Sequence, residues 1–217
     1  MPTETPRKRN VDGERRAEIG RQRRARTRAR ILAVMFEIYG RENGLYCRVE
    51  EVCEGAGITR KTFYNHFAGM EDLREALTWE VSHDFLMAVI ASINTMPNAA
   101  QRAASAIRYY IERGRTDPRW AWSIVNLSAG GVVFGAETFA QSMRTVEEGI
   151  DDGEFSVSSH LIGRDILMGT TLSALFTQLR QDTPDDYPAQ VAAAVLKGLG
   201  CSALVAERFA TAPLPPL

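Results

Sequence analysis

The sequence predicts an all-α protein in which a small N-terminal helix-turn-helix domain of three helices precedes a larger helical bundle. Apolar side chains recur at helical spacing in one segment after another, and no alternating pattern typical of strands lies between them. An apolar content of 45% is typical of a globular chain that buries a core. The third observation is a division of charge between the two parts.

Basic and acidic residues are separated along the chain. Residues 1–67 contain 15 Lys and Arg against 9 Asp and Glu, a balance of +6. Residues 68–217 contain 11 against 18, a balance of −7, and the net charge of −1 conceals this difference. Segregated charge indicates a basic part that meets a polyanion. The alternative is chance clustering on solvated surfaces.

The N-terminal extension is polar. Residues 1–20 include prolines and glycines and few apolar side chains, so we expect them to be disordered. Residues 21–30 hold six arginines and lead into the first helix without a breaker. This arginine run is either an arm that enters a minor groove or follows phosphates, or a solvated extension of the helix.

The first two helices are amphipathic. Ile31, Met35 and Tyr39 recur at i, i+4 and i+8, which predicts a helix that ends before Gly44. A second, short helix is expected at residues 48–55. It would bury the apolar side chains Val49, Val52 and Cys53.

The third helix follows a tight turn. Gly57 suits a turn position with positive φ, and the Thr59 hydroxyl can cap the helix. Phe63 and Phe67 lie one turn apart and can be buried together, which leaves a polar face outward. This arrangement is typical of a helix-turn-helix DNA reader. The candidate DNA-binding residues are Arg48, Thr59, Arg60, Lys61, Thr62, Tyr64, Asn65 and His66.

The candidate contacts differ in kind. Arg60 can bridge two guanine acceptors, and Lys61 is a more generic cation. Which of them reads a base and which only positions the protein stays open. Tyr64 and His66 are expected at phosphates, although His66 could instead pack against the first helix.

The rest of the chain reads as helical. Breaks at Gly, Pro and Asp residues divide it into further helices, and the tail 211–217 is expected to be disordered. The expected helices span residues 70–93, 99–114, 118–127, 131–150, 159–181 and 186–209.

The pattern as a whole resembles a known family. The residues Thr62-Phe63-Tyr64-Asn65-His66-Phe67, after an Ala-Gly-Ile turn and before Glu71-Asp72-Leu73, are similar to the signature of the TetR family of bacterial transcriptional regulators. The close similarity covers about residues 25–80. It implies a homodimer with N-terminal DNA-binding domains and larger helical domains that bind a small effector. One departure is Met70, where the family usually has a Lys that reaches a phosphate.

The resemblance assigns boundaries and a function. The DNA-binding domain is expected at residues 21–68 and the effector-binding and dimerisation domain at residues 69–210. The expected function is that of a repressor released from a palindromic operator by a small molecule. The alternative is a helical small-molecule-binding protein or enzyme with a vestigial DNA-binding domain, which Met70 alone supports.

The large apolar side chains of the second domain suggest an effector pocket between helices. The same residues at helical spacing are often plain core. Helices 159–181 and 186–209 are apolar over more than one face, so they are expected to form the dimer interface. The candidate effector-binding residues are Trp120, Trp122, Phe134, Phe139, Met143, Met168 and Phe176.

Other chemistries find little support. Glu80 and His83 have the ExxH spacing of helical di-iron sites, but a second ExxH is absent. There is no GxSxG, GxGxxG or GxxxxGK[ST] motif, so neither an enzyme nor a cofactor or metal is expected. Three cysteines form no CxxC and read as reduced thiols. No apolar run approaches about 18 residues and no signal segment is present, so we expect a cytoplasmic protein that does not contact a membrane.

Overall fold

The computed structural model describes residues 7–130 and 133–217. Within these ranges all regular secondary structure is helical, which confirms the all-α prediction. The elements are α1 (Arg7–Tyr39), the 3₁₀ helix η1 (Gly44–Tyr46), α2 (Val49–Ala56), α3 (Arg60–Tyr64), α4 (Met70–Ile93), α5 (Ala99–Thr116), α6 (Pro118–Ser128), α7 (Ala136–Asp151), α8 (His160–Gln178), α9 (Tyr187–Gly198) and α10 (Ala203–Ala210).

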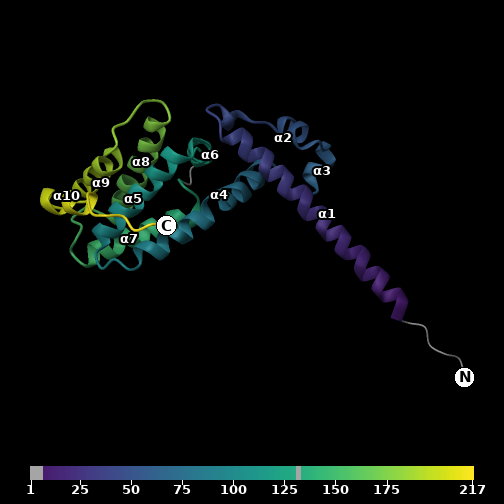
Figure 1. Cartoon of the computed structure of the whole chain (residues 1–217), viewed down its shortest axis with the longest axis horizontal. Coiled ribbons are helices and arrows are strands. Elements are labelled where there is room, and N and C mark those ends of the chain that lie inside the picture. Colours follow the sequence, from purple (N-terminus) through teal and green to yellow (C-terminus); the bar gives the residue numbers. More distant parts are fainter. Residues whose placement is uncertain (1–6, 131–132) are drawn as a thin grey trace, which may run out of the picture.

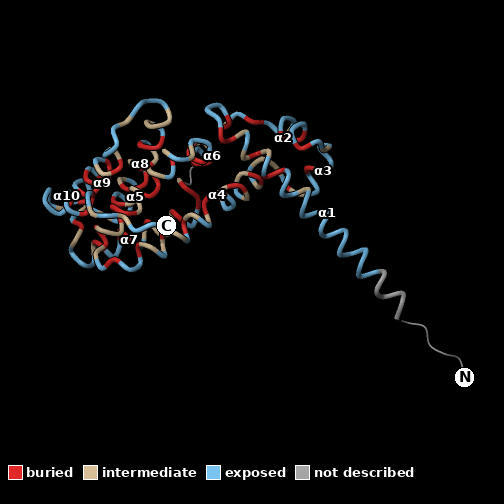
Figure 2. Tube along the Cα trace, in the orientation of Figure 1, coloured by how far each residue is buried: buried red, intermediate tan, exposed pale blue. Residues whose placement is uncertain are grey.

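The helices form two groups (Figure 1). We call α1–α3 with the first turns of α4 the N-terminal domain, and the remainder of α4 with α5–α10 the C-terminal bundle. Each group has its own buried core, visible as inward-facing red segments in Figure 2. The helix α4 contributes to both cores, since Leu73 and Leu77 are buried in the first and Leu86 and Val89 lie in the bundle.

The core of the N-terminal domain is small and closed. Ile31, Met35 and Tyr39 of α1 are fully buried, together with Phe63 and Phe67. The spacing of these residues therefore places them on the buried faces that the sequence predicted. Contacts among the three α-helices leave the opposite face of α3 on the surface.

The two groups are joined through α6. The buried Asn126 side chain donates hydrogen bonds to the carbonyl oxygens of Tyr39 and Arg41, each over 2.8 Å. An ion pair between Arg119 and Glu37 lies beside them. Because Tyr39 ends α1, these bonds fasten the C-terminal end of α1 to the bundle.

Helix α5 lies at the centre of the bundle, packed against α8, α9 and α10. Gly114 permits the close crossing of α5 and α8, because an added Cβ would lie 2.4 Å from a methyl group of Leu175. The predicted helices at 70–93, 99–114 and 118–127 agree with α4, α5 and α6 within two residues.

The predicted disorder of residues 1–20 is wrong for residues 7–20, which belong to α1; residues 1–6 lie outside the described residues. The long side chains around Gly13 and Gly20 favour helix, and a single Gly costs only about 1 kcal/mol there. Glu18 accepts hydrogen bonds from Arg21 and Gln22 one turn later, which supports the helix.

The C-terminal tail is also ordered, contrary to prediction. Residues 211–217 are not helical, but they lie along α5. The carbonyl of Ala212 accepts a hydrogen bond from Arg108, and that of Pro215 accepts one from the Tyr109 hydroxyl over 2.7 Å. Leu214 packs against the bundle core. The proline-rich composition rules out helix but leaves carbonyls free to accept these bonds.

Two predicted helices differ from the structure in their extent. The helix expected at 186–209 is divided into α9 and α10 at Gly200, whose φ is +93°. An added Cβ there would lie 2.0 Å from the Ser156 hydroxyl oxygen, so a glycine is required. The helix expected at 131–150 begins only at Ala136, after Phe134 with φ +59°; residues 131–132 lie outside the described residues.

One helix of the described residues, α4, is long and apolar enough by length and composition to cross a membrane. The expectation that no segment meets this criterion therefore has one exception. Its side chains Leu77 and Ile93 pack in the two protein cores, whereas Trp79 and Met87 are exposed.

Candidate DNA-binding surface and ligand cavity

The turn between α2 and α3 is formed by local interactions. Gly57 ends α2 with φ +59° in the left-handed region, where a side chain would be strained. Thr59 is extended, and its hydroxyl oxygen accepts a hydrogen bond from the Thr62 N–H over 3.2 Å. The predicted cap is therefore confirmed, and it fixes where α3 begins.

The buried side of α3 holds it on the domain. The rings of Phe63 and Phe67 lie 5.9 Å apart, and both side chains are almost completely buried. Tyr64 packs its ring edge against Phe63 at 5.4 Å and remains 49% exposed. The outward face of α3 therefore consists of polar groups on a rigid support.

Arg60 is held by neighbours on that face. Its guanidinium lies 2.8 Å from a carboxylate oxygen of Glu50 on α2. A hydrogen bond with Tyr64 and the charge of Glu50 raise the pKa of Arg60. Arg60 is therefore a cation that is already oriented, and a phosphate or base would compete with Glu50 for it. Lys61 beside it is exposed.

The other candidate residues lie at the ends of α2 and α3. Arg48 is the exposed N-cap of α2, where its N–H donates to Glu51 over 2.8 Å. Asn65 is exposed, and its carbonyl accepts a hydrogen bond from Arg24 of α1. The structure thus places the eight candidate residues on α2, α3 and the adjoining turns. Their contacts with DNA stay a prediction.

His66 lies partly buried between α3 and α1. Burial, and then the charges of Arg24 and Arg28, lower the pKa of this histidine. Its imidazole is therefore neutral at pH 7 and would approach a phosphate as a hydrogen-bond donor. Met70, in place of the usual Lys, is half-buried against the domain core.

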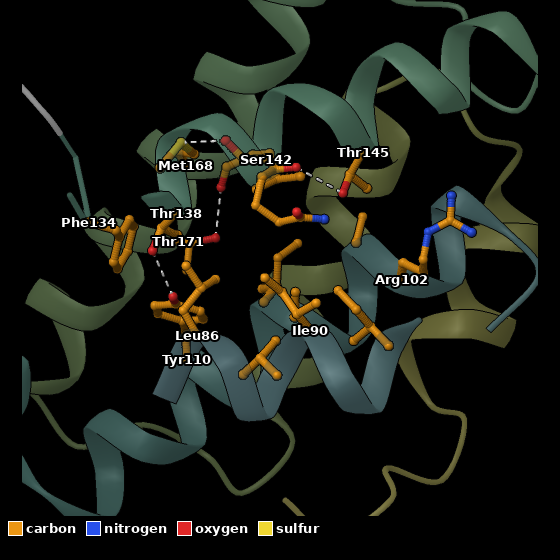
Figure 3. Close-up of a pocket in the computed structure, with 17 residues that line it drawn as sticks. Leu86, Ile90, Arg102, Tyr110, Phe134, Thr138, Ser142, Thr145, Met168 and Thr171 are labelled. Carbon is orange, nitrogen blue, oxygen red and sulfur yellow. Dashed lines mark hydrogen bonds between the residues drawn. The ribbon is translucent and has the colours of Figure 1, made fainter. Parts of the chain in front are cut away.

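A cavity lies within the bundle between α4, α5, α7 and α8 (Figure 3). About 540 Å³ is not filled by protein atoms, and part of this space is open to solvent. The space that the centre of a water-sized sphere can reach is only about 50 Å³, which is below the usual range of small-molecule sites, so a ligand that fits here must be compact. Helix α4 supplies aliphatic side chains, including Leu86 and Ile90, whereas α7 and α8 supply hydroxyl groups. The polar lining side chains are Arg102, Tyr110, Thr138, Gln141, Ser142, Thr145 and Thr171.

Three hydroxyls of the cavity wall already donate their protons within the protein. The Ser142 hydroxyl donates to the Phe139 carbonyl at 2.8 Å, and the Thr145 hydroxyl donates to the Gln141 carbonyl at 3.2 Å. On α8, the Thr171 hydroxyl donates to the Leu167 carbonyl at 2.7 Å. A hydroxyl oxygen that donates its proton retains lone pairs. The wall therefore offers chiefly acceptors, which suit a ligand that carries O–H or N–H donors.

The cavity offers no free charge among its described lining residues. Arg102 stands at one end, where it donates to the Met96 carbonyl and pairs with Glu148 over 2.7 Å. No carboxylate lines the space. Burial raises the pKa of Tyr110 to about 12, so its hydroxyl, 3.1 Å from that of Thr138, stays protonated. A neutral ligand therefore matches this wall.

Of the seven predicted effector-binding residues, Phe134 and Met168 line this cavity. Trp120 is buried between helices, donates to the Val81 carbonyl over 2.9 Å and borders a separate groove.

The others lie elsewhere. Trp122 and Phe176 form an edge-to-face pair beside Arg180, Phe139 packs beneath Arg164, and Met143 is half-buried outside the lining. The ligand role of all seven stays a prediction.

The hydroxyl wall is absent from the sequence prediction. Thr138, Ser142 and Thr145 recur at i, i+4 and i+7, so they share one face of α7, and this face is buried. Three hydroxyl residues on the buried face of an amphipathic helix indicate a polar patch inside a core. That spacing is the signal in the sequence that could have revealed it.

The candidate ExxH pair has another role. His83 Nδ1 lies 2.8 Å from a Glu137 oxygen, and its ring stacks on Trp79 at 4.7 Å. Among the described residues no three His, Cys, Asp or Glu side chains gather as metal ligands would. The His83–Glu137 contact instead joins α4 to α7.

Comparison with known proteins adds to this geometry. The family profile of bacterial regulatory proteins of the tetR family matches residues 42–77, and that of the tetracyclin repressor-like C-terminal domain matches residues 98–211. Comparison with curated proteins gives no match.

Solved structures share the fold. RolR without ligand gives a TM-score of 0.69 at 22% identity, covering 87% of this chain and 98% of RolR. RolR in complex with resorcinol gives a TM-score of 0.69 at 24% sequence identity, and the match covers 90% of this chain and 98% of RolR. FadR from Bacillus subtilis in complex with stearoyl-CoA gives a TM-score of 0.61 at 21% sequence identity, and the match covers 79% of this chain and 96% of FadR. The C-terminal profile alone spans more than half of the chain, so the chain belongs to the TetR family and is a DNA-binding transcriptional regulator.

Proposed function

We propose that this protein is a cytoplasmic repressor that leaves a palindromic operator when a small neutral molecule enters the bundle cavity. The observation that carries the proposal is one continuous helix, α4, with an end in each site. Its first turns pack against α1 and place Leu73 and Leu77 in the core that also holds Phe63 of α3, and its later turns form the aliphatic wall of the cavity. A ligand that moves α4 therefore acts on the DNA-binding surface.

DNA recognition is assigned to the outward face of α3. Arg60 and Lys61 would enter the major groove, while Tyr64 and His66 would touch the backbone. The ion pair with Glu50 supports Arg60 in this role, because it orients the guanidinium before DNA arrives.

The protein would act as a homodimer through the helices predicted at 159–181 and 186–209, which correspond to α8 and α9–α10. Leu161, Ile162 and Phe176 on α8 are large apolar side chains that are 41–50% exposed in the single chain. An added Cβ at Gly169 on the same helix meets nothing within 4 Å, so a partner helix could approach closely there. Two recognition helices would then read successive major grooves, about 34 Å apart.

The effector is proposed to be a compact ring compound with hydroxyl groups. The acceptor-rich wall of Ser142, Thr145 and Thr171 would receive its O–H donors, and the aliphatic wall on α4 would cover its ring. Resorcinol, the ligand in the RolR complex, has this chemistry. An acyl-CoA, the ligand in the FadR complex, carries phosphates for which this cavity offers no free cation among its described lining residues.

The mechanism is a shift between two populations. In one arrangement of α4, the two α3 helices of the dimer lie at the distance that separates successive major grooves of the operator. In the other arrangement, the cavity accommodates the ligand. A ligand that binds only the second lowers operator affinity, and the operator lowers ligand affinity by the same factor.

The DNA half is tested by selecting bound sequences from a random duplex pool. We expect a palindrome to be enriched. Replacing both Arg60 and Lys61 by Ala should reduce its binding at least 100-fold, since each good base contact contributes about 1–3 kcal/mol. The matched control replaces Arg113 and Arg144, which are exposed on α5 and α7, by Ala. Enrichment without symmetry, or equal losses in both variants, would contradict the assignment.

The effector half is tested by titrating resorcinol into the protein–palindrome complex. We expect release of DNA and direct binding by calorimetry. Thr171→Val removes one acceptor from the cavity wall and should weaken binding about 10-fold. Thr177→Val makes the same change on α8 outside the lining and should have no effect. Release that is equally strong in both variants would place the ligand elsewhere.

A further inference from the structure

The N-terminal part of α1 extends far beyond the core of its domain (Figure 1). Ile31 is the first fully buried residue of the helix, and residues 13–30 before it are exposed except Thr27 (Figure 2). We call residues 13–30 the arm. It contains eight arginines and two glutamates, namely Arg15, Arg16, Arg21, Arg23, Arg24, Arg26, Arg28, Arg30, Glu14 and Glu18.

The arm is fixed beside the recognition helix. The Arg24 guanidinium donates a hydrogen bond to the carbonyl of Asn65, the C-cap of α3, over 3.0 Å. The Arg28 guanidinium lies 4.4 Å from the centre of the Phe67 ring. These contacts make the arm continuous with the proposed DNA-binding surface. The helix continues from Arg24 to Arg7, about 25 Å at 1.5 Å per residue.

Positive charge surrounds the arm. Arg23, Arg26 and Arg30 follow one another at three- and four-residue spacing, so they share one side of the helix. Arg21, Arg24 and Arg28 share the opposite side by the same spacing. A polyanion that passes along either side of the arm would therefore meet a row of arginines.

This charge is not neutralised within the described part of the chain. Arg21, which lies 2.5 Å from Glu18, is the one arginine of the arm that forms an ion pair there. Like charges three or four residues apart destabilise an isolated helix. A polyanion would relieve this repulsion, which gives the arm a specific reason to bind one.

We propose that the arm binds the phosphates of duplex DNA flanking the half-site that α3 reads. The proposal rests on the DNA-binding function above and extends its contact surface. Entry into a minor groove is excluded for the helical arm, because a helix of 10–12 Å diameter does not enter a groove about 6 Å wide. Guanidinium groups on both sides of the helix suit the phosphates of the backbone, and a phosphate contact carries no sequence information.

The test compares two variants with equal charge. The arm variant replaces Arg23, Arg26 and Arg30 by Gln, which has a similar helix propensity; the structure-fixing Arg24 and Arg28 remain. The control variant replaces three arginines of α5 and α7, outside the proposed dimer interface, by Gln, namely Arg113, Arg115 and Arg144. Circular dichroism establishes that both retain the helix content of the wild type.

The binding measurements use two probes, each over a range of salt concentrations. One is a mixed-sequence duplex of 40 base pairs, and the other is the same duplex with the selected palindrome at its centre. Each phosphate that the protein neutralises adds about 0.9 to the slope of log affinity against log salt. Removing one arginine–phosphate interaction should therefore reduce the change in affinity between 50 and 200 mM salt by roughly 3- to 4-fold.

We expect the arm variant to show a shallower slope with both probes and to keep its preference for the palindrome. The control variant should behave as the wild type. If the arm variant retains the wild-type slope while the palindrome is still preferred, the arm proposal fails and the proposed function stands. If no palindrome is preferred but the arm variant loses slope, the proposed function fails and the arm proposal stands.

A second measurement excludes another polyanionic surface. Vesicles with one-third anionic lipid are tested for binding of the wild type and of the arm variant. We expect vesicle binding to be weak and the DNA slope to change. Arm-dependent binding to vesicles, with an unchanged DNA slope, would overturn the proposal.

Discussion

The N-terminal domain and the C-terminal bundle differ in how completely their cores are filled. The N-terminal domain has a filled core, and its proposed DNA-binding residues lie on the surface, where polar side chains of α3 stand opposite the buried Phe63 and Phe67. The bundle has its proposed ligand site inside, where a cavity interrupts the core and hydroxyls line it. A surface function needs a rigid support, whereas an internal site needs incomplete packing.

This difference implies that mutations act differently in the two regions. Truncating a core residue in the N-terminal domain removes stability and DNA binding together. The bundle already tolerates empty space, so changes in its lining should alter ligand binding more than folding. The following substitutions test the contrast in order of expected effect.

The largest effect is expected from Phe63→Ala. The side chain is fully buried, and loss of a buried Phe costs about 3–5 kcal/mol. Denaturant unfolding should show this loss, and DNA binding should disappear with the support of α3. Phe134→Ala makes the same change at the cavity wall, where we expect a smaller loss. The contrast between the regions is wrong if Phe134→Ala proves the more damaging substitution.

Asn126→Ala should have the next largest effect. Its loss leaves the carbonyls of Tyr39 and Arg41 without their donor, at a cost of about 2 kcal/mol. Since these bonds join α1 to α6, the variant should still bind effector but release DNA less completely. Calorimetry and DNA titration measure the two quantities separately.

Asn43→Ala is the control for that substitution, because Asn43 caps η1 without a side-chain hydrogen bond. It should leave both stability and release unchanged. Full release by the Asn126→Ala protein would show that α6 does not transmit the signal.

A moderate effect is expected from Thr59→Ala. The substitution removes the hydroxyl that accepts the Thr62 N–H, and loss of an N-cap costs about 1 kcal/mol. Operator affinity should fall, because α3 has only five residues and depends on its cap. Thr59→Ser keeps the hydroxyl and should retain the stability. An equal loss in both variants would mean that the methyl group, not the cap, is what matters.

The smallest effect concerns pH. Burial and the charges of Arg24 and Arg28 lower the pKa of His66 in the folded state. As the pH falls, His66 is therefore protonated in the unfolded chain before it is protonated in the folded protein. His66 thus reduces the stability of the fold once the pH is below the ordinary histidine pKa near 6.5. Replacing His66 by Gln should flatten the dependence of unfolding free energy on pH between 7 and 5. His160→Gln, at an exposed site on α8, is the control.

The sequence predicted the N-terminal domain in detail because its signals are local. The cap at Thr59, the left-handed turn at Gly57 and the buried pair Phe63 and Phe67 all lie within about ten residues of one another. Each requirement is satisfied by neighbours along the chain. A motif can therefore report the structure and its exposed face.

The cavity could be predicted only in part because its wall is assembled from distant segments. Leu86, Tyr110, Thr138 and Thr171 come from four different helices, and their convergence depends on how those helices cross. Large aromatic residues are the most visible signal in the sequence, but Trp120 fills core and Trp122 packs on the outside. Small hydroxyl residues define the space instead.

The attachment of the C-terminal end of α1 to α6 has a mechanical consequence. The helix is a rod of about 50 Å, held near Tyr39 by Asn126 and Arg119. A rotation of about 5° at that pivot would move the backbone near Arg24 by about 2 Å and that near Arg7 by about 4 Å. Hydrogen bonds to phosphates tolerate much smaller changes in length. The length of α1 thus acts as a lever, and if the arm binds DNA as proposed, a rotation that barely disturbs the bundle would be enough to move the arm away from the phosphates.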